Sequence, residues 1–72
     1  MEKLWHTMDE EPIISGVILF SNIQNRLYDG VYMGDGCFDV NGLIVDKRNF
    51  DCWCQRGDFF KETRLREFLN NN

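Results

Sequence analysis

The chain has no long apolar run, a single proline and only three cysteines among its 72 residues. No window approaches the roughly 18 apolar residues that a membrane-spanning helix requires, and no basic segment leads into an apolar stretch at the N-terminus. We therefore expect no membrane partner. An odd number of cysteines does not fit the disulfide framework of a small secreted domain, so free thiols and a cytoplasmic location are expected.

Positive charge is also scarce, because eight Lys and Arg stand against twelve Asp and Glu, for a formal net charge of −4. Residues 1–55 hold nine acids and four bases, whereas residues 56–72 hold three acids and four bases. Binding to phosphate backbones depends on Lys and Arg, so the composition disfavours nucleic acid as a partner. Another protein with a basic surface is favoured, and the sequence leaves open a homo-oligomer formed through an exposed edge strand.

Aromatic residues are what the chain does have, with six Phe, two Trp and two Tyr in a hydrophobic fraction of 43%. Rings bury large areas, so a few of them can supply most of the hydrophobic stabilisation of a short chain. We expect one small domain over residues 1–72 with a ring-rich core.

Short apolar runs joined by turn residues predict an antiparallel β-meander over residues 13–55. Gly34-Asp35-Gly36 contains residues that tolerate positive φ, and Asn41-Gly42 is typical of a two-residue type I′ hairpin. The expected strands are residues 13–20, 26–33, 37–40, 43–45 and 50–55, with a polar connection over 46–49.

Alternation along these strands predicts which side chains share a face of the sheet. Tyr28, Gly30 and Tyr32 are expected on one face, with an aromatic ring of a neighbouring strand over Gly30. In the last strand, one face is expected to hold Phe50, Cys52 and Cys54, and the other Asp51, Trp53 and Gln55.

The N-terminal residues 1–12 are expected to form a strap or a brief edge strand. Pro12 lacks an amide hydrogen and biases the preceding residue towards an extended backbone. Trp5 is expected to anchor this strap in the core.

A helix is predicted over residues 58–69, with Asp58 as its N-cap. Its Leu65, Phe68 and Leu69 fall at i, i+3 and i+4 and form an apolar stripe that can cover one sheet face. The predicted fold class is therefore α+β, with four or five antiparallel strands in meander order and one C-terminal α-helix packed on one face.

Three cysteines and the only histidine are the candidate ligands of a structural zinc ion: His6, Cys37, Cys52 and Cys54. Zinc would add folding energy to a small core. However, cysteines at i and i+2 of a strand point the same way, whereas zinc modules hold cysteine pairs on turns that wrap the ion. Cysteine is also among the residue types most often buried, so packing is the favoured interpretation, zinc is the alternative, and no cofactor is expected.

No catalytic pattern is evident in the sequence. His6 has Asp9 and Glu10 nearby, but neither a nucleophile nor a paired motif accompanies it, and acid–base catalysis requires a positioned partner. The sequence therefore predicts a protein that is not an enzyme.

Acidic and aromatic side chains form the candidate interaction surface. The triplet Asp9-Glu10-Glu11 is interpreted as a solvated loop or, alternatively, as an acidic contact patch. Three rings could stack bases, as on sheet-based binders of single-stranded nucleic acid, but acids flank them, so core packing or a protein contact is favoured. The residues predicted for protein interaction are Asp9, Glu10, Glu11, Tyr28, Tyr32, Asp35 and Trp53.

A sparse pattern of single residues runs through most of the chain: Trp5, Glu11-Pro12, the strand 17–20, Gly30-Val31-Tyr32, Gly36-x-Phe38, Gly42 and Trp53. This pattern resembles a group of small domains of unknown function from bacterial and phage or prophage genomes. The chain departs from that group in its Cys-Trp-Cys ending and its basic C-terminal helix. The resemblance implies a mobile-element origin and a small sheet domain, and it supplies no active site.

These features together predict a non-enzymatic protein-interaction module, such as a phage- or prophage-encoded inhibitor or modulator of a host protein. A small zinc-stabilised domain is the first alternative function. A sheet-based binder of single-stranded nucleic acid is the second.

Overall fold

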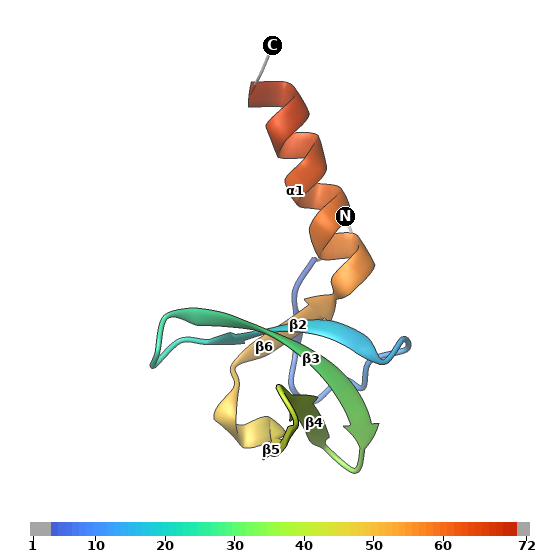
Figure 1. Ribbon diagram of the computed structural model, residues 1–72, viewed down its shortest axis with the longest axis vertical. Helices are drawn as coiled ribbons and strands as arrows, with labels where there is room; N and C mark the ends of the chain where they lie inside the picture. The colour runs from blue at the N-terminus through green and yellow to red at the C-terminus, as the bar shows by residue number, and fades with distance from the viewer. Residues whose placement is uncertain (1–3, 71–72) are drawn as a thin grey trace.

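The computed structural model describes residues 4–70 of the chain. Six strands, a 3₁₀ turn and a helix follow one another: β1 (His6–Thr7), β2 (Gly16–Ser21), β3 (Arg26–Gly34), β4 (Cys37–Val40), β5 (Leu43–Asp46), η1 (Lys47–Asn49), β6 (Cys52–Gln55) and α1 (Arg56–Asn70) (Figure 1). The predicted α+β class with an antiparallel sheet and one C-terminal helix is confirmed. The strap supplies the additional strand, β1.

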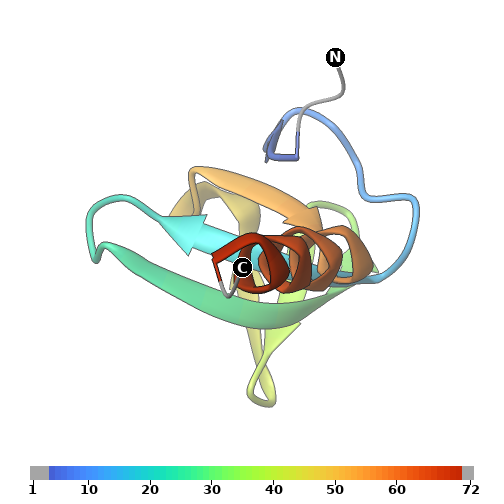
Figure 2. The same ribbon diagram turned by 90° about the horizontal axis from the view of Figure 1, so that it is seen from above.

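All six strands belong to one antiparallel sheet in the order β1-β6-β2-β3-β4-β5. The meander holds from β2 to β5, but β6 pairs with β2 instead of β5. In a flat sheet four strand spacings, about 19 Å, would separate β5 from β6. Only residues 47–51 join these strands, and three of them form the compact η1 turn. The sheet therefore curls, and one of its faces becomes the inner face (Figure 2).

Both predicted turns are confirmed, and their backbone angles show why these residues occupy them. Asn41 and Gly42 have φ values of 54° and 86°, as a type I′ turn requires, and the Gly42 amide donates to Oδ1 of Asp39 at 2.9 Å. Residues 34–36 likewise all have positive φ.

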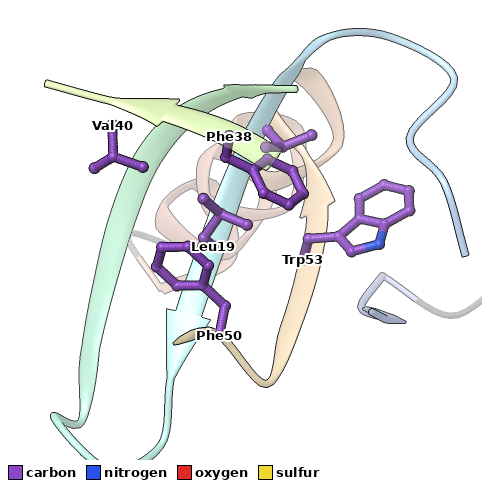
Figure 3. Packing of buried hydrophobic residues seen from close by; sticks show 6 residues of the cluster. Leu19, Phe38, Val40, Phe50 and Trp53 are labelled. Atoms are coloured by element: carbon purple, nitrogen blue, oxygen red, sulfur yellow. The ribbon is translucent and has the colours of Figure 1, made fainter. Parts of the chain in front are cut away.

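The inner face holds the core, a cluster of six side chains: Val17, Leu19, Phe38, Val40, Phe50 and Trp53 (Figure 3). Phe38 lies at its centre with an exposed fraction of 1%, and its ring meets that of Phe50 edge to face. The prediction that Phe50 shares a face with Cys52 and Cys54 is wrong. β6 begins only at Cys52, so strand alternation does not extend back to Phe50.

Gly30 permits a close approach between strands on the inner face. A Cβ at this position would lie 2.9 Å from Cδ1 of Leu19. The predicted close approach is thus present, but an aliphatic side chain makes it in place of the expected ring.

The first central strand, β2, is shorter than predicted, because it begins at Gly16 and not at residue 13. Its pairing with β6 ends at Val17 and its pairing with β3 ends at Gly16, beyond which the Ser15 carbonyl accepts one further bond from the Tyr32 amide at 2.7 Å. Ile13 is consequently 95% exposed.

Trp5 anchors the strap on the outer face, not in the core as predicted. Its ring packs edge to face against Phe20 and Phe59, with centroids 6.4 and 6.2 Å away. The strap, the sheet and the first turn of α1 therefore meet at one aromatic contact.

The helix begins at Arg56, so Asp58 lies within its first turn and is not the predicted N-cap. Arg56 fixes this end, since its Nε donates to Asp29 at 2.8 Å and its Nη2 donates to the Gly30 carbonyl at 3.1 Å. Beyond its first turns α1 projects away from the sheet (Figure 1). The predicted stripe of Leu65, Phe68 and Leu69 lies outside the described side chains. Within residues 4–70, no helix is both long and apolar enough to cross a membrane.

Candidate binding site at the N-terminal strap

The strap is held on the sheet through the side chain of Trp53. The indole Nε1 of Trp53 donates to the carbonyl oxygens of Thr7 at 3.1 Å and Glu10 at 3.0 Å. β1 pairs with β6 so that His6 lies opposite Trp53, and their rings stack with centroids 4.5 Å apart. A buried indole needs an acceptor, and here Thr7 of β1 and Glu10 of the following turn supply one each.

Trp53 is only 3% exposed, which agrees with the interpretation that its ring packs in the core and does not form an exposed platform for stacked bases. Its ring belongs to the core cluster, and the Nε1–H at the edge of the ring binds the strap backbone. Trp53 therefore supports the strap from the core side and lines the candidate site.

The acidic triplet is exposed, and two of its carboxylates are oriented by neighbours. Oε2 of Glu10 lies 3.2 Å from Nδ1 of His6, and Oε1 of Glu11 accepts from the Tyr32 hydroxyl at 3.0 Å. The contact of Glu10 lies within the strap, whereas the contact of Glu11 joins the strap to β3.

The pKa of Tyr32 reports the negative charge around the strap. The Gly36 amide hydrogen bond to the hydroxyl acts to lower this pKa, but partial desolvation, the hydrogen bond to Glu11 and the charges of Glu11 and Asp35 outweigh it and raise the pKa above its ordinary value. Four of the predicted residues, Asp9, Glu10, Glu11 and Tyr32, line one hollow of about 240 Å³ together with Lys47, and Asp35 lies close enough to act on the pKa of Tyr32.

A pocket of about 380 Å³ opens at the strap, and we call it the strap pocket. It is lined by His6, Glu10, Glu11, Ile13, Trp53, Gln55 and Asp58. Three of these side chains are carboxylates, two are aromatic, and none is a Lys or Arg. A pocket of this composition favours a cation, which gains from the carboxylates and from aromatic ring faces.

Gln55 lines the strap pocket and carries a buried polar group. Its carboxamide Oε1 and Nε2 are both buried, and neither has a hydrogen-bond partner in the described part of the chain. Sequence reasoning placed Gln55 on the face of Trp53 but assigned it no role, and it also missed Ile13 and Asp58. The i, i+2 spacing from Trp53 was the signal available for Gln55.

Tyr28 lies apart from the strap pocket. Its hydroxyl donates to Gln24, its ring meets Phe50 edge to face, and the guanidinium of Arg26 lies over it at 5.3 Å. It lines a separate hollow of about 230 Å³ with residues of the β4–β5 hairpin. Tyr28, Tyr32 and Trp53 therefore do not form one platform.

The four candidate zinc ligands are not brought together. Cys52 and Cys54 lie on the outer face of β6, Cys37 lies on β4 beyond two intervening strands, and His6 stacks on the inner face. No group of three or more metal-binding side chains occurs within residues 4–70. Burial, together with the charge of Asp58, raises the pKa of Cys54 to about 11 and so disfavours the thiolate that binds metal.

An open apolar groove of about 650 Å³ lies on the outer face beside Trp5. Its lining consists of Trp5, Phe20, Asn25, Arg26, Leu27 and Cys52. The groove offers hydrophobic contact but few polar groups that could orient a ligand. The strap pocket, in contrast, combines carboxylates and aromatic rings.

Comparison of the chain with protein-family models, curated proteins and solved structures finds no match. The resemblance to small domains of bacterial and phage genomes stays a prediction. Functional inference therefore rests on the geometry of the strap.

Proposed function

We propose that this protein is a non-enzymatic interaction module that binds a basic segment of a partner protein at the strap pocket. The observation that supports it is the convergence of Glu10, Glu11 and Asp58 around a pocket with aromatic walls and no basic side chain. In keeping with the resemblance noted above, we propose that it acts as a phage- or prophage-derived modulator of a host protein.

The charge distribution supports a basic partner. Asp9 and Asp35 add negative charge beside Glu11, so a cationic segment would be attracted before contact and would find carboxylates at the pocket. Phosphates would be repelled by the same groups, which disfavours a nucleic-acid ligand at this position.

Rigidity supports the same function. The backbone of the strap is fixed at Thr7 and Glu10 by the Trp53 indole, and Glu11 is held by Tyr32. A preformed site loses less conformational entropy on binding than a flexible acidic loop would.

The test is fluorescence anisotropy with labelled Lys- and Arg-rich peptides and acidic peptides of equal length. Basic peptides should bind, with an affinity that falls as salt rises, and the double variant Glu10→Gln/Glu11→Gln should weaken binding about tenfold. Glu67→Gln, an exposed charge on α1, is the matched control and should change the affinity little. Equal binding of basic and acidic peptides, or an unaltered affinity of the double variant, would refute the proposal.

A further inference from the structure

The sheet has two edge strands, β1 and β5, and β5 is the longer and more apolar of the two. β1 holds two residues, whereas β5 holds four and pairs with β4 alone. Its Leu43 and Ile44 are 69% and 61% exposed. Proteins commonly protect such an edge with lysine, proline or a bulge, and residues 43–45 contain none of these. β5 is therefore the edge at which a further strand can join the sheet.

The backbone of β5 directs a complete pair of hydrogen-bonding groups outward. Val40 and Leu43 flank the two-residue type I′ turn and bond each other, so every second residue of β5 bonds to β4. The amide of Lys47, which donates to the Gly36 carbonyl at 2.8 Å, fits this alternation. The N–H and C=O of Ile44 therefore point away from β4, and no strand within residues 4–70 pairs with that edge.

A second copy of the chain supplies a complementary strand. We infer that two copies associate through antiparallel pairing of their β5 strands, about a twofold axis at Ile44. In this register the two Ile44 residues exchange both of their outward hydrogen bonds, and their side chains meet on the outer face. On the inner face, Leu43 of each copy lies opposite Val45 of the other. Both exposed apolar side chains of the edge are thereby covered.

The neighbouring registers are less complementary. Only outward-pointing residues can bond across the axis, so the axis can move from Ile44 only to Leu43 or Val45 within this strand. With the axis at Val45, Ile44 lies opposite Asp46. With the axis at Leu43, Ile44 lies opposite Gly42. The register centred on Ile44 is thus the one that pairs both exposed apolar side chains with apolar ones.

The charge at this edge permits two copies to approach. Residues 40–49 hold two bases and one acid, whereas the other residues of 1–55 hold two bases and eight acids. Repulsion between two chains of net charge −4 is therefore weaker here than over the rest of the body. The inference does not depend on the proposed function, because residues 43–46 do not line the strap pocket.

The experiment measures self-association and amide exchange on the same samples of the full chain, with a reductant because the cysteines are free. A contact through one short strand is smaller than standard interfaces, so sedimentation should show a weak dimer with a Kd of about 0.1 mM. Solvent exchange of the Ile44 amide, measured by NMR, should slow about fivefold as the dimer forms. The amides of Leu43 and Val45 bond to β4 and should be protected at every concentration.

Ile44→Lys tests the edge directly. The side chain is 61% exposed, so the variant should fold, and in a dimer two ammonium groups would lie opposite each other across the axis. Self-association should weaken about tenfold or more. Ile23→Lys is the matched control, since Ile23 is 96% exposed in the turn between β2 and β3, and it should dimerise as the original chain does.

Three results would overturn the inference. A chain that stays monomeric at every concentration, with the Ile44 amide in free exchange, would leave the edge open to a strand of another protein. Species larger than a dimer would indicate pairing of β5 with β1 of the next copy, which forms an open chain of subunits. Dimerisation that survives Ile44→Lys but is lost in Leu27→Lys would place the contact on the outer face of β3.

Discussion

The two faces of the curled sheet differ in how their side chains are covered. On the inner face, strands from every part of the sheet direct rings and aliphatic groups into one cluster around Phe38. On the outer face, the start of α1 contacts β2 and β6, and Ile18 and Cys54 of these strands are buried. The side chains of Leu27, Val31 and Met33 on β3 are exposed. The curl thus forms one core on the inner face, whereas the outer face is covered only in part, by the strap and the first turn of α1.

Truncating the centre of the inner face should have the largest effect. Phe38→Ala removes a ring that is 1% exposed and should cost about 4 kcal/mol, enough to unfold most of so small a domain. Leu27→Ala on the outer face, where the side chain is 46% exposed, should cost less than about 1 kcal/mol. Urea denaturation followed by tryptophan fluorescence measures both, and similar losses for the two variants would contradict the contrast between the faces.

Filling the close approach on the inner face should have an intermediate effect. Gly30→Ala places a Cβ 2.9 Å from Leu19, and the resulting overpacking should cost about 2 kcal/mol. Gly57→Ala is the matched control, since a Cβ there meets nothing within 4 Å and alanine favours the helix, for a gain of about 0.5–1 kcal/mol. A neutral Gly30→Ala would mean that Leu19 can move aside, and the inner face would then be less tightly packed than described.

The smallest effect concerns the covered part of the outer face. Burial raises the pKa of Cys54 from 9.0 to about 11 in the folded chain, so the folded state retains this proton where the unfolded state has lost it. The associated stabilisation is complete below pH 9 and should disappear as the pH rises towards about 11. In Cys54→Ser the free energy of unfolding should fall less steeply over this range, as measured by urea denaturation at a series of pH values. Parallel pH dependences of the two proteins would indicate that Cys54 reaches solvent.

Local chemistry made part of the fold predictable from the sequence. Asn41-Gly42 and residues 34–36 form the predicted turns, because Gly, Asn and Asp tolerate the positive φ that these turns require. Pairing between distant segments was not predictable in this way. Meander order predicts that β6 pairs with β5, the strand before it in the chain, whereas in the curled sheet β6 pairs with β2.

The candidate site was predictable only in its charge. The acids of the strap stand in one run of sequence, but the pocket exists because the Trp53 indole reaches carbonyls 46 and 43 residues away. The sequence also left open whether Trp53 packs in the core or contacts a partner, because composition does not distinguish a buried ring from an exposed one. Gln55 becomes notable only once its lack of partners is visible.

The place of β2 between β3 and β6 has a consequence for the order of folding. Strands β2 to β5 pair through short hairpins between neighbours in the sequence. The pairing of β2 with β6 joins residues far apart in the sequence, such as Val17 with Gln55 and Phe20 with Cys52, and therefore forms later. Until β6 arrives, one edge of β2 is an unpaired apolar ribbon, VILF, open to any other extended chain. Closure by β6 is therefore expected to limit the folding rate, and a nascent chain that has not yet released residues 52–55 is the form most prone to aggregate.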